Sequence, residues 1–379
     1  MRHFDVHGLT FAVTGWPEVA EAVALDFAHF ARPDGTPRVT VALERRAPDY
    51  DALGEGLASF VTPRNVVYQQ PGRTVVDYFG RALAVVTGDR VLVQGEDAPL
   101  VHEAAYLYLL SRTGAHLDAR GLIRLHALGL AGADGGVAVV LPSGGGKSTL
   151  ALRALDAPGV RLVSEDTPLL DRHGLLHPFP LRIGINATDA GRLPSEHVRR
   201  IERMELHPKL ALDVAAFADR IVPGAVLLRH IVVGRRSLGR EARLRRIRAA
   251  GAVGPLLREA VVGVGVYQGM EFVLQHGMRS VGGMAPAGLR RLRSAAAGLR
   301  SATVWELVLG RDLEGNWGAL APLLGEQGDG HGGDAREVVD DVQADAGERL
   351  DRPAAAGEQS VEAVVEREQG AEPGAGEPR

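Results

Sequence analysis

The chain of 379 residues contains no cysteine, which excludes disulfide bonds, zinc sites with thiolate ligands and cysteine nucleophiles. It also lacks any uninterrupted apolar run near the ~20 residues that a membrane-spanning helix needs. The first residues do not show the basic and then apolar profile of a signal peptide. These absences favour a cytoplasmic protein that acts away from membranes.

Lysine is the other scarce residue, since the chain has two lysines, Lys147 and Lys209, beside 41 arginines. Lys147 follows a glycine loop, residues 143–146, and precedes a serine and a threonine. Glycines allow successive backbone N–H groups to converge on an anion, and the start of a helix adds partial positive charge. We therefore predict a phosphate-binding loop that holds a nucleotide through Ser143, Gly144, Gly145, Gly146, Lys147, Ser148 and Thr149. Leu141 stands where such a loop usually begins with glycine.

The surroundings of the glycine loop fit this interpretation. A strand is predicted over residues 136–141, a helix over 148–155 and a second strand over 160–164, beside the first. Glu165 and Asp166 follow that second strand, although adjacent acids can also form a solvated turn. Because Mg²⁺ prefers oxygen ligands, we expect Ser148 and one of these two acids to hold the metal and the other acid to accept a proton.

Composition divides the chain into three parts. Residues 1–115 show short β-like runs and a helical pattern over 99–110, which predicts a small α+β region. Residues 116–325 carry the glycine loop and predict an α/β core. Residues 326–379 contain 15 acidic residues and five arginines, so we expect a disordered acidic tail of charge −10. The remaining chain then has a charge of +6, too little to indicate nucleic-acid binding.

Taken together, these motifs resemble the HPr serine kinase/phosphorylase family, especially its stand-alone members such as lasso-peptide kinases. The likeness covers about residues 120–320 and rests on His126, the loop with its Lys147-Ser148 pair, and the acids Glu165 and Asp166. It implies a fold of the phosphoenolpyruvate carboxykinase type and Mg-ATP-dependent phosphorylation of a serine or another hydroxyl.

The resemblance also implies roles for individual residues. Glu165 stands where the family places its catalytic acid, usually an aspartate, while Asp166 corresponds to the metal ligand and His126 would assist the base. The longer side chain of Glu165 puts the reverse, phosphorylase reaction in question. The glycine-rich segment that HPr kinases carry near the C-terminus is missing here, so HPr is not the expected substrate.

Several basic residues complete the prediction. Arg182 follows a proline-restrained segment and could stabilise the charge of a transferring phosphoryl group, or form a structural ion pair instead. Lys209, the second lysine, is a further catalytic candidate. A cluster of seven arginines between residues 235 and 248 is interpreted as a solvated hairpin or face, with a docking surface for an acidic peptide as the alternative.

The sequence thus predicts a kinase that uses ATP and Mg²⁺ and phosphorylates a hydroxyl of a peptide or protein. Two alternatives remain open: a nucleotide-gated peptide-binding module without turnover, and a carboxykinase acting on oxaloacetate. We expect no nucleic-acid partner, since an aromatic and basic groove is not evident. The sequence leaves the oligomeric state open, a homo-oligomer included.

Overall fold

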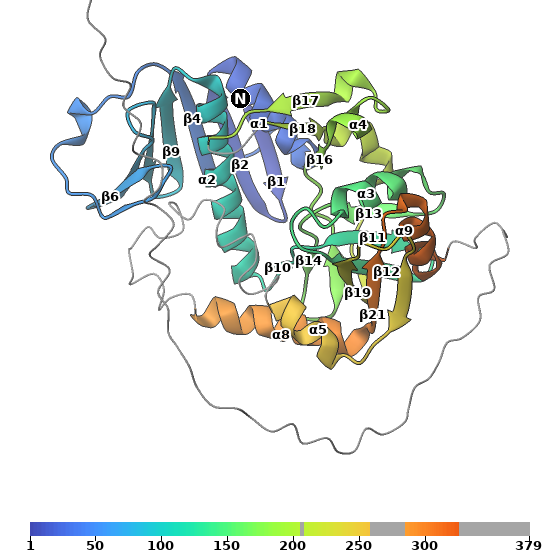
Figure 1. Cartoon of the computed structure of the whole chain (residues 1–379). Helices are drawn as coiled ribbons and strands as arrows, with labels where there is room; N and C mark the ends of the chain where they lie inside the picture. Colours follow the sequence, from blue (N-terminus) through green and yellow to red (C-terminus); the bar gives the residue numbers. More distant parts are fainter. Residues whose placement is uncertain (205–207, 258–284, 326–379) are drawn as a thin grey trace, which may run out of the picture. The chain divides into compact units, whose positions relative to one another are not determined.

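The computed structural model describes residues 1–204, 208–257 and 285–325, which belong to one compact unit, Met1–Gly333. Mixed β-sheets and α-helices confirm the expected α/β class (Figure 1). The acidic tail predicted for residues 326–379 lies outside the described residues. Where the structure describes the chain, none of its helices has the length and apolar character that a membrane crossing requires.

The N-terminal residues form one sheet and two α-helices. Its strands are β1 (Arg2–Val6), β2 (Leu9–Gly15), β3 (Ala31–Arg32), β4 (Val39–Arg45), β5 (Phe60–Val61), β6 (Val66–Gln70), β7 (Arg73–Asp77), β8 (Ala82–Thr87) and β9 (Arg90–Gly95). They lie in the order β3-β1-β2-β4-β9-β8-β7-β6-β5, with β2, β4 and β9 parallel. Helix α1 (Pro17–Asp26) connects β2 towards β4, and α2 (Ala98–Ala119) follows β9.

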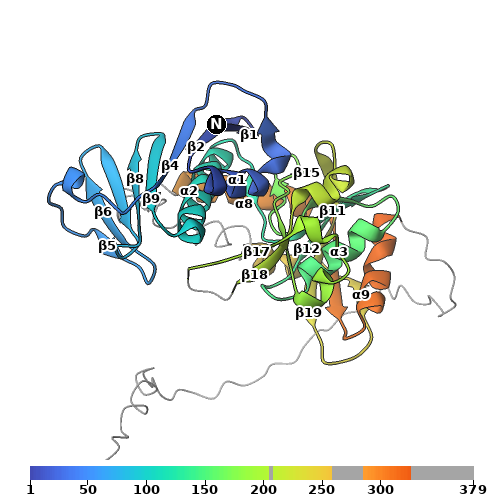
Figure 2. The same cartoon turned by 90° about the horizontal axis from the view of Figure 1, so that it is seen from above.

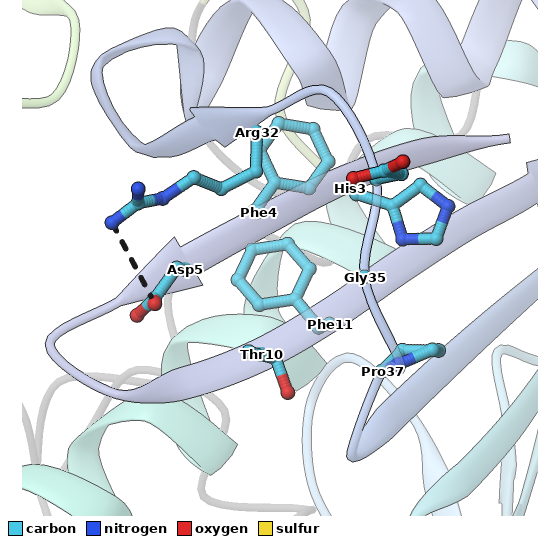
Figure 3. A pocket seen from close by; sticks show the side chains of 9 residues that line it. His3, Phe4, Asp5, Thr10, Phe11, Arg32, Gly35 and Pro37 are labelled. Carbon is cyan, nitrogen blue, oxygen red and sulfur yellow. Dashed lines mark ion pairs between the residues drawn. The ribbon is translucent and has the colours of Figure 1, made fainter.

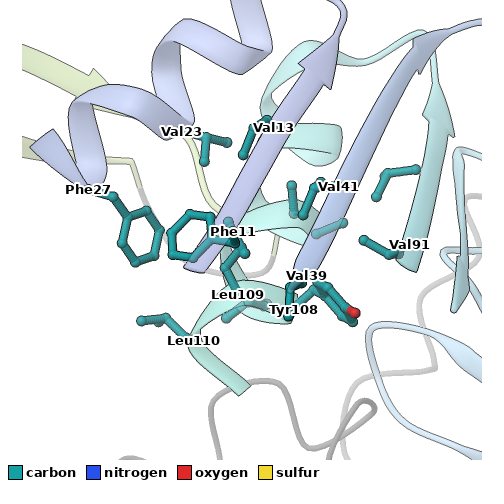
Figure 4. Close-up of a cluster of buried hydrophobic side chains, with 14 of the residues drawn as sticks. Phe11, Val13, Val23, Phe27, Val39, Val41, Val91, Tyr108, Leu109 and Leu110 are labelled. Atoms are coloured by element: carbon teal, nitrogen blue, oxygen red, sulfur yellow. The ribbon is translucent and has the colours of Figure 1, made fainter. Parts of the chain in front are cut away.

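Both helices pack on one face of this sheet (Figure 2). Alternate residues of a strand share a face, so Val39 and Val41 of β4 both point into the core (Figure 4). Phe27, next to α1, packs against Phe11 of β2, and Tyr108 of α2 belongs to the same core. The helix predicted for residues 99–110 is thus confirmed, but it is longer than expected. It extends past residue 115, where we expected the N-terminal region to end and the core to begin.

A second sheet carries the glycine loop. Its strands are β10 (Ile123–Arg124), β11 (Leu128–Gly132), β12 (Gly135–Val140), β13 (Arg161–Ser164), β14 (Leu169–Leu170), β15 (Leu175–His177), β19 (Val226–Arg236), β20 (Arg243–Arg246) and β21 (Thr303–Leu309). Their order is β10-β14-β15-β19-β12-β11-β13, and β21 pairs with both β19 and β20. Strands β12, β19 and β21 are parallel to one another.

Helices cover both faces of this sheet, so β12 is buried on two sides. Val137 and Val139 belong to a core with α3 (Lys147–Asp156) and α9 (Leu313–Leu320). Ala138 and Val140 belong to a second core with α5 (Ala250–Leu257) and α8 (Ala285–Ser301). Burial on both faces explains why this strand is a continuous apolar run rather than an alternating one.

A small third sheet packs beside α3. It consists of β16 (Ile183–Ile185), β18 (Lys209–Leu212) and β17 (Val198–Ile201), all antiparallel, with the short helix α4 (Ala187–Ala190) after β16. Ile183, Ile185 and Leu212 contribute to the core beneath α3. Of the predicted basic residues, Lys209 begins β18, and Arg182 directly precedes its neighbour β16.

One predicted neighbour relation is wrong. The strand before Glu165 and Asp166, β13, does not lie beside β12, because β11 pairs with both and separates them. Since β11 is antiparallel to each, β12 and β13 run in the same direction. The glycine loop and the two acids therefore still meet at one edge of the sheet.

Candidate functional site

The glycine loop connects β12 to α3, as the sequence predicted. Gly144 and Gly146 have φ angles of 71° and 109°, in the left-handed region that favours glycine. Gly146 is the N-cap of α3, and no side chain caps that end of the helix. The first backbone N–H groups of α3 thus keep their capacity to bind an anion.

Space lies open above this loop. Ser143 and Gly144 are exposed, and a Cβ atom added at Gly144 or Gly146 would meet no atom within 4 Å. Ser148 and Thr149, at the start of α3, are half-buried. The loop therefore presents backbone to an unfilled region that a phosphate group could enter.

Lys147 points from the start of α3 into a polar cluster. Its side chain is only 6% exposed, and its Nζ lies 2.9 Å from His126 Nε2 and 2.9 Å from the carbonyl oxygen of Leu141. Nζ is also 3.5 Å from Asp166 Oδ1. A nearly buried ammonium group needs such partners, and they hold it at the base of the loop.

His126 and Asp166 form the other side of this cluster. His126 Nε2 lies 3.2 Å from Asp166 Oδ1. Backbone hydrogen bonds fix the two segments, since the N–H of Ala127 donates to the carbonyl of Asp166 at 3.1 Å and that of Leu125 to Pro168 at 3.0 Å. The structure thus brings together Lys147, His126 and Asp166, three of the predicted residues.

Glu165 faces Ser148 rather than Lys147. The Ser148 hydroxyl donates a hydrogen bond to Glu165 Oε1 at 2.5 Å. Burial, followed by the negative charge of Asp166, raises the pKa of Glu165 to about 7, although Ser148 and Lys209 act in the opposite direction. A carboxyl group with this pKa exchanges its proton near neutral pH.

The pKa of the neighbouring acid, Asp166, is shifted in the opposite direction. Burial by itself would raise the pKa of Asp166, but the hydrogen bond and charge of His126, together with Lys147, outweigh it and lower the pKa. Its side chain is 39% exposed. Asp166 is therefore ionised at neutral pH and accessible from the loop side, whereas Glu165 is poised to take or release a proton.

Lys209 lies on the third sheet, near Glu165. Its Nζ covers Gly184 of β16, at which a Cβ atom would lie 2.0 Å from that nitrogen. Its positive charge lowers the pKa of Glu165, which shows that the two groups are close enough to interact. Lys209 is exposed to solvent.

Arg182, in contrast, is engaged elsewhere. It forms an ion pair with Asp26 of α1, and its guanidinium lies 4.3 Å from the centre of the Tyr106 ring in α2. The structural ion pair that the sequence left open is therefore present. The catalytic role of Arg182 stays a prediction.

This ion pair belongs to a buried charge cluster that sequence reasoning missed. Asp26 is 0% exposed and contacts Arg182, Arg199 of β17 and His102 of α2, the last at 2.8 Å. Arg199 also pairs with Asp213 at 2.5 Å. Burial opposes ionisation of Asp26, but Arg182, His102 and Arg199 hold its pKa well below the ordinary value. No local pattern marks Asp26, because its partners lie far away in sequence.

A metal would need ligands beyond the protein. Among the described residues, no group of three or more His, Cys, Asp or Glu side chains is arranged to hold a metal ion. Ser148, Glu165 and Asp166 nevertheless offer hydroxyl and carboxylate oxygens at one edge of the sheet. Such a set suits Mg²⁺, which usually keeps water and substrate phosphate oxygens in its coordination sphere.

A separate hollow of about 250 Å³ lies on the N-terminal sheet (Figure 3). Phe4 and Phe11 line it with ring centroids 4.8 Å apart, and Arg32 reaches Asp5 at 3.7 Å across it. None of the predicted site residues lines this hollow. It contains no arrangement of acid, base and anion-binding backbone comparable to that around the glycine loop.

Comparison with known proteins adds no assignment. The chain matches neither a protein-family model nor a curated protein. The resemblance to the HPr kinase family therefore remains a prediction that rests on the residues of the loop, the histidine and the acid pair.

Proposed function

We propose that the protein is a Mg-ATP-dependent kinase of the HPr kinase type that phosphorylates a hydroxyl of a peptide or protein. The observation that carries the proposal is the convergence of Lys147, His126, Glu165 and Asp166 beside a glycine loop with free helix N–H groups. Anion-binding backbone, a cation and two acids with divergent pKa values are what phosphoryl transfer requires.

The loop and Lys147 would bind the phosphates of ATP. Nζ of Lys147 would exchange its contact with the Leu141 carbonyl for phosphate oxygens, which compensate its charge better. Asp166, ionised and partly exposed, and Ser148 would hold Mg²⁺, which neutralises charge on the phosphate oxygens.

Glu165 would act as the general base. Its raised pKa of about 7 makes it basic enough to accept the proton of an acceptor hydroxyl. The hydroxyl oxygen then bonds to the γ-phosphorus while the bond to the bridging oxygen of ADP breaks. Lys209, whose charge acts on Glu165, would stabilise the negative charge that develops.

The test is phosphoryl transfer from ATP labelled on the γ-phosphate to small peptides and a soluble cell extract. In Lys147→Ala we expect transfer to fall at least about a hundredfold, because a preorganised cation is lost. Arg153→Ala, which removes a half-exposed cation from the same helix α3, is the matched control and should retain transfer.

The result of this experiment distinguishes the kinase from the two other candidate functions. A labelled acceptor that appears with wild type and the control but not with Lys147→Ala supports the kinase. Nucleotide binding without any labelled acceptor would favour the peptide-binding module. Turnover that requires oxaloacetate would favour a carboxykinase.

A further inference from the structure

Seven arginines form a surface of their own beyond β12. We name it the arginine patch; it consists of Arg235, Arg236, Arg240, Arg243, Arg245, Arg246 and Arg248. All seven are exposed. Of the two forms expected for this segment, a solvated hairpin or face, the structure shows the solvated face and no hairpin, because β21 lies between β19 and β20 and pairs with both.

Among the described residues, most of these charges have no ion-pair partner. Glu306 forms ion pairs with two of them, since its Oε2 lies 2.6 Å from Arg245 Nη2 and its Oε1 lies 3.4 Å from Arg235 Nε. The side chains of both arginines are still more than 70% exposed. In the part of the chain that the structure describes, no ion pair engages Arg236, Arg240 or Arg243. The patch therefore carries an excess of positive charge towards solvent.

The segment that connects β19 to β20 is held in place by its backbone. The N–H of Ser237 donates a hydrogen bond to the carbonyl of Leu309 at 2.8 Å. Two further backbone hydrogen bonds run from the N–H of Arg311 to the carbonyl of Gly239 at 2.9 Å and from the N–H of Asp312 to the carbonyl of Arg240 at 3.1 Å. These bonds fix the positions from which the arginines project. A preorganised cluster of like charges is more costly to maintain than scattered charges and points to an anionic partner.

The first four arginines of the patch, Arg235, Arg236, Arg240 and Arg243, lie towards the same edge of the sheet as the glycine loop, because β12, β19 and β21 are parallel. The other three follow β20 away from that edge. Val140 of β12 is in register with Val233 of β19, so Arg235 and Arg236 follow directly beside the loop. The antiparallel strand β20 begins at Arg243, opposite Val308 near the end of β21. The glycine loop thus separates the arginine patch from the acids Glu165 and Asp166.

We propose that the arginine patch docks an acidic segment of the peptide or protein whose hydroxyl is phosphorylated. This inference rests on the proposed kinase function and adds the class of its substrate. Guanidinium groups bind carboxylates through paired N–H donors, which gives recognition by Asp and Glu side chains. Single-stranded nucleic acid is the weaker partner, because residues 235–248 include no aromatic side chain on which bases could stack.

The strand order also sets the spacing of the substrate. Neighbouring strands lie about 4.8 Å apart, so the acids are about 10 Å to one side of β12 and the patch extends about 5 to 15 Å to the other. An extended peptide rises about 3.3 Å per residue. Acidic residues about five to seven positions from the acceptor serine would therefore reach the patch.

The experiment compares two fluorescent peptides by anisotropy in the presence of Mg²⁺ and ADP. One peptide has a serine and four acidic residues centred six positions away, and the other has the matching amides. We expect the acidic peptide to bind about tenfold more tightly, consistent with several exposed ion pairs. In Arg236→Gln/Arg240→Gln/Arg243→Gln this preference should vanish.

The control is Arg32→Gln/Arg38→Gln/Arg90→Gln, which removes the same charge from exposed arginines of the N-terminal sheet. It should preserve the preference for the acidic peptide. Equal binding of both peptides to wild type, equal losses in the two triple variants, or tighter binding of a single-stranded oligonucleotide would each overturn the proposal. A loss of ADP affinity in the patch variant without a change in peptide binding would also overturn it.

Transfer is measured separately so that the two proposals can fail independently. If the acidic preference is present but labelled ATP phosphorylates no peptide or extract protein, the docking surface stands and the kinase proposal falls. If transfer occurs equally well to both peptides, the kinase stands and the docking surface falls.

Discussion

Two clusters of charge, each built around one aspartate, differ in their access to solvent. Asp26 contacts two arginines and His102 and is 0% exposed. Asp166 contacts Lys147 and His126 and is 39% exposed. The residue types are similar, but one cluster is closed and the other opens beside the glycine loop. Closure indicates a structural role, whereas an open cluster can exchange its internal partners for a ligand.

The clusters also differ in what they connect. The Asp26 cluster joins α1 and α2 of the N-terminal region to Arg182 and Arg199, which lie more than 150 residues after Asp26 in the sequence. The Asp166 cluster lies between residues 126 and 166 and is fixed by backbone hydrogen bonds that join residues 125–127 to residues 166–168. We infer that the first stabilises the packing of distant segments and the second prepares a site.

The largest effect is expected from a substitution that breaks the closed cluster around Asp26. Asp26→Asn leaves Arg182 and Arg199 without their buried carboxylate, so the free energy of unfolding should fall by about 3–5 kcal/mol. Urea unfolding followed by circular dichroism measures this loss. Asp156→Asn, at an 80% exposed position, should change stability by less than about 0.5 kcal/mol. Equal stability of the two variants would contradict a structural role for the Asp26 cluster.

A substitution beside the open cluster should act on transfer instead. Glu165→Gln keeps an oxygen that can accept the Ser148 hydroxyl but removes the base, so transfer should fall about a hundredfold. Because burial raises the pKa of Glu165, its ionised form costs the folded state stability as pH rises towards 7. The variant should therefore be no less stable than wild type at neutral pH. Glu96→Gln, at an exposed position, is the control for transfer.

A change of pH, without any substitution, should also distinguish the two clusters. Transfer should fall about tenfold per pH unit below the pKa of Glu165, which is about 7, since the protonated acid cannot accept a proton. The pKa of Asp26 is lowered from its ordinary value of 3.8. Asp26 therefore stabilises the folded state fully at pH values above 3.8, and this stabilisation is lost only as the pH falls below that value. Its contribution should thus stay constant from pH 5 to 8. A flat rate profile across pH 7 would exclude Glu165 as the base.

Much of the open site could be predicted because it is local. The spacing of glycines, Lys147 and Ser148 after an apolar run fixes a strand, a tight loop and a helix start within a short segment. The acids at the end of β13 follow from the next strand in the chain. The fine arrangement did not follow, since the pairing of Ser148 with Glu165 and of His126 with Asp166 depends on how the segments pack.

Two N-terminal elements were not predicted, although the sequence carries signals for them. Pro17 at the first turn of α1 is a recognised start of a helix, yet α1 was not predicted. Strand β1 alternates between buried and half-buried residues, although its five residues are too few for a firm pattern. The partners of Asp26 had no such signal, because ion pairs across 76 to 173 residues leave no periodicity.

The sequence by itself determined the mixed α/β class, the glycine loop with Lys147 at the start of a helix, and the acids that end the following strand. These features depend on backbone conformation and apolar patterning over about ten residues at a time. The tertiary structure decided that β11 separates β12 from β13, that Asp26 engages Arg182, and that the arginine patch begins at the edge of the sheet beside the loop. Those decisions required strands and helices distant in sequence to bury their faces together, which no local pattern specifies.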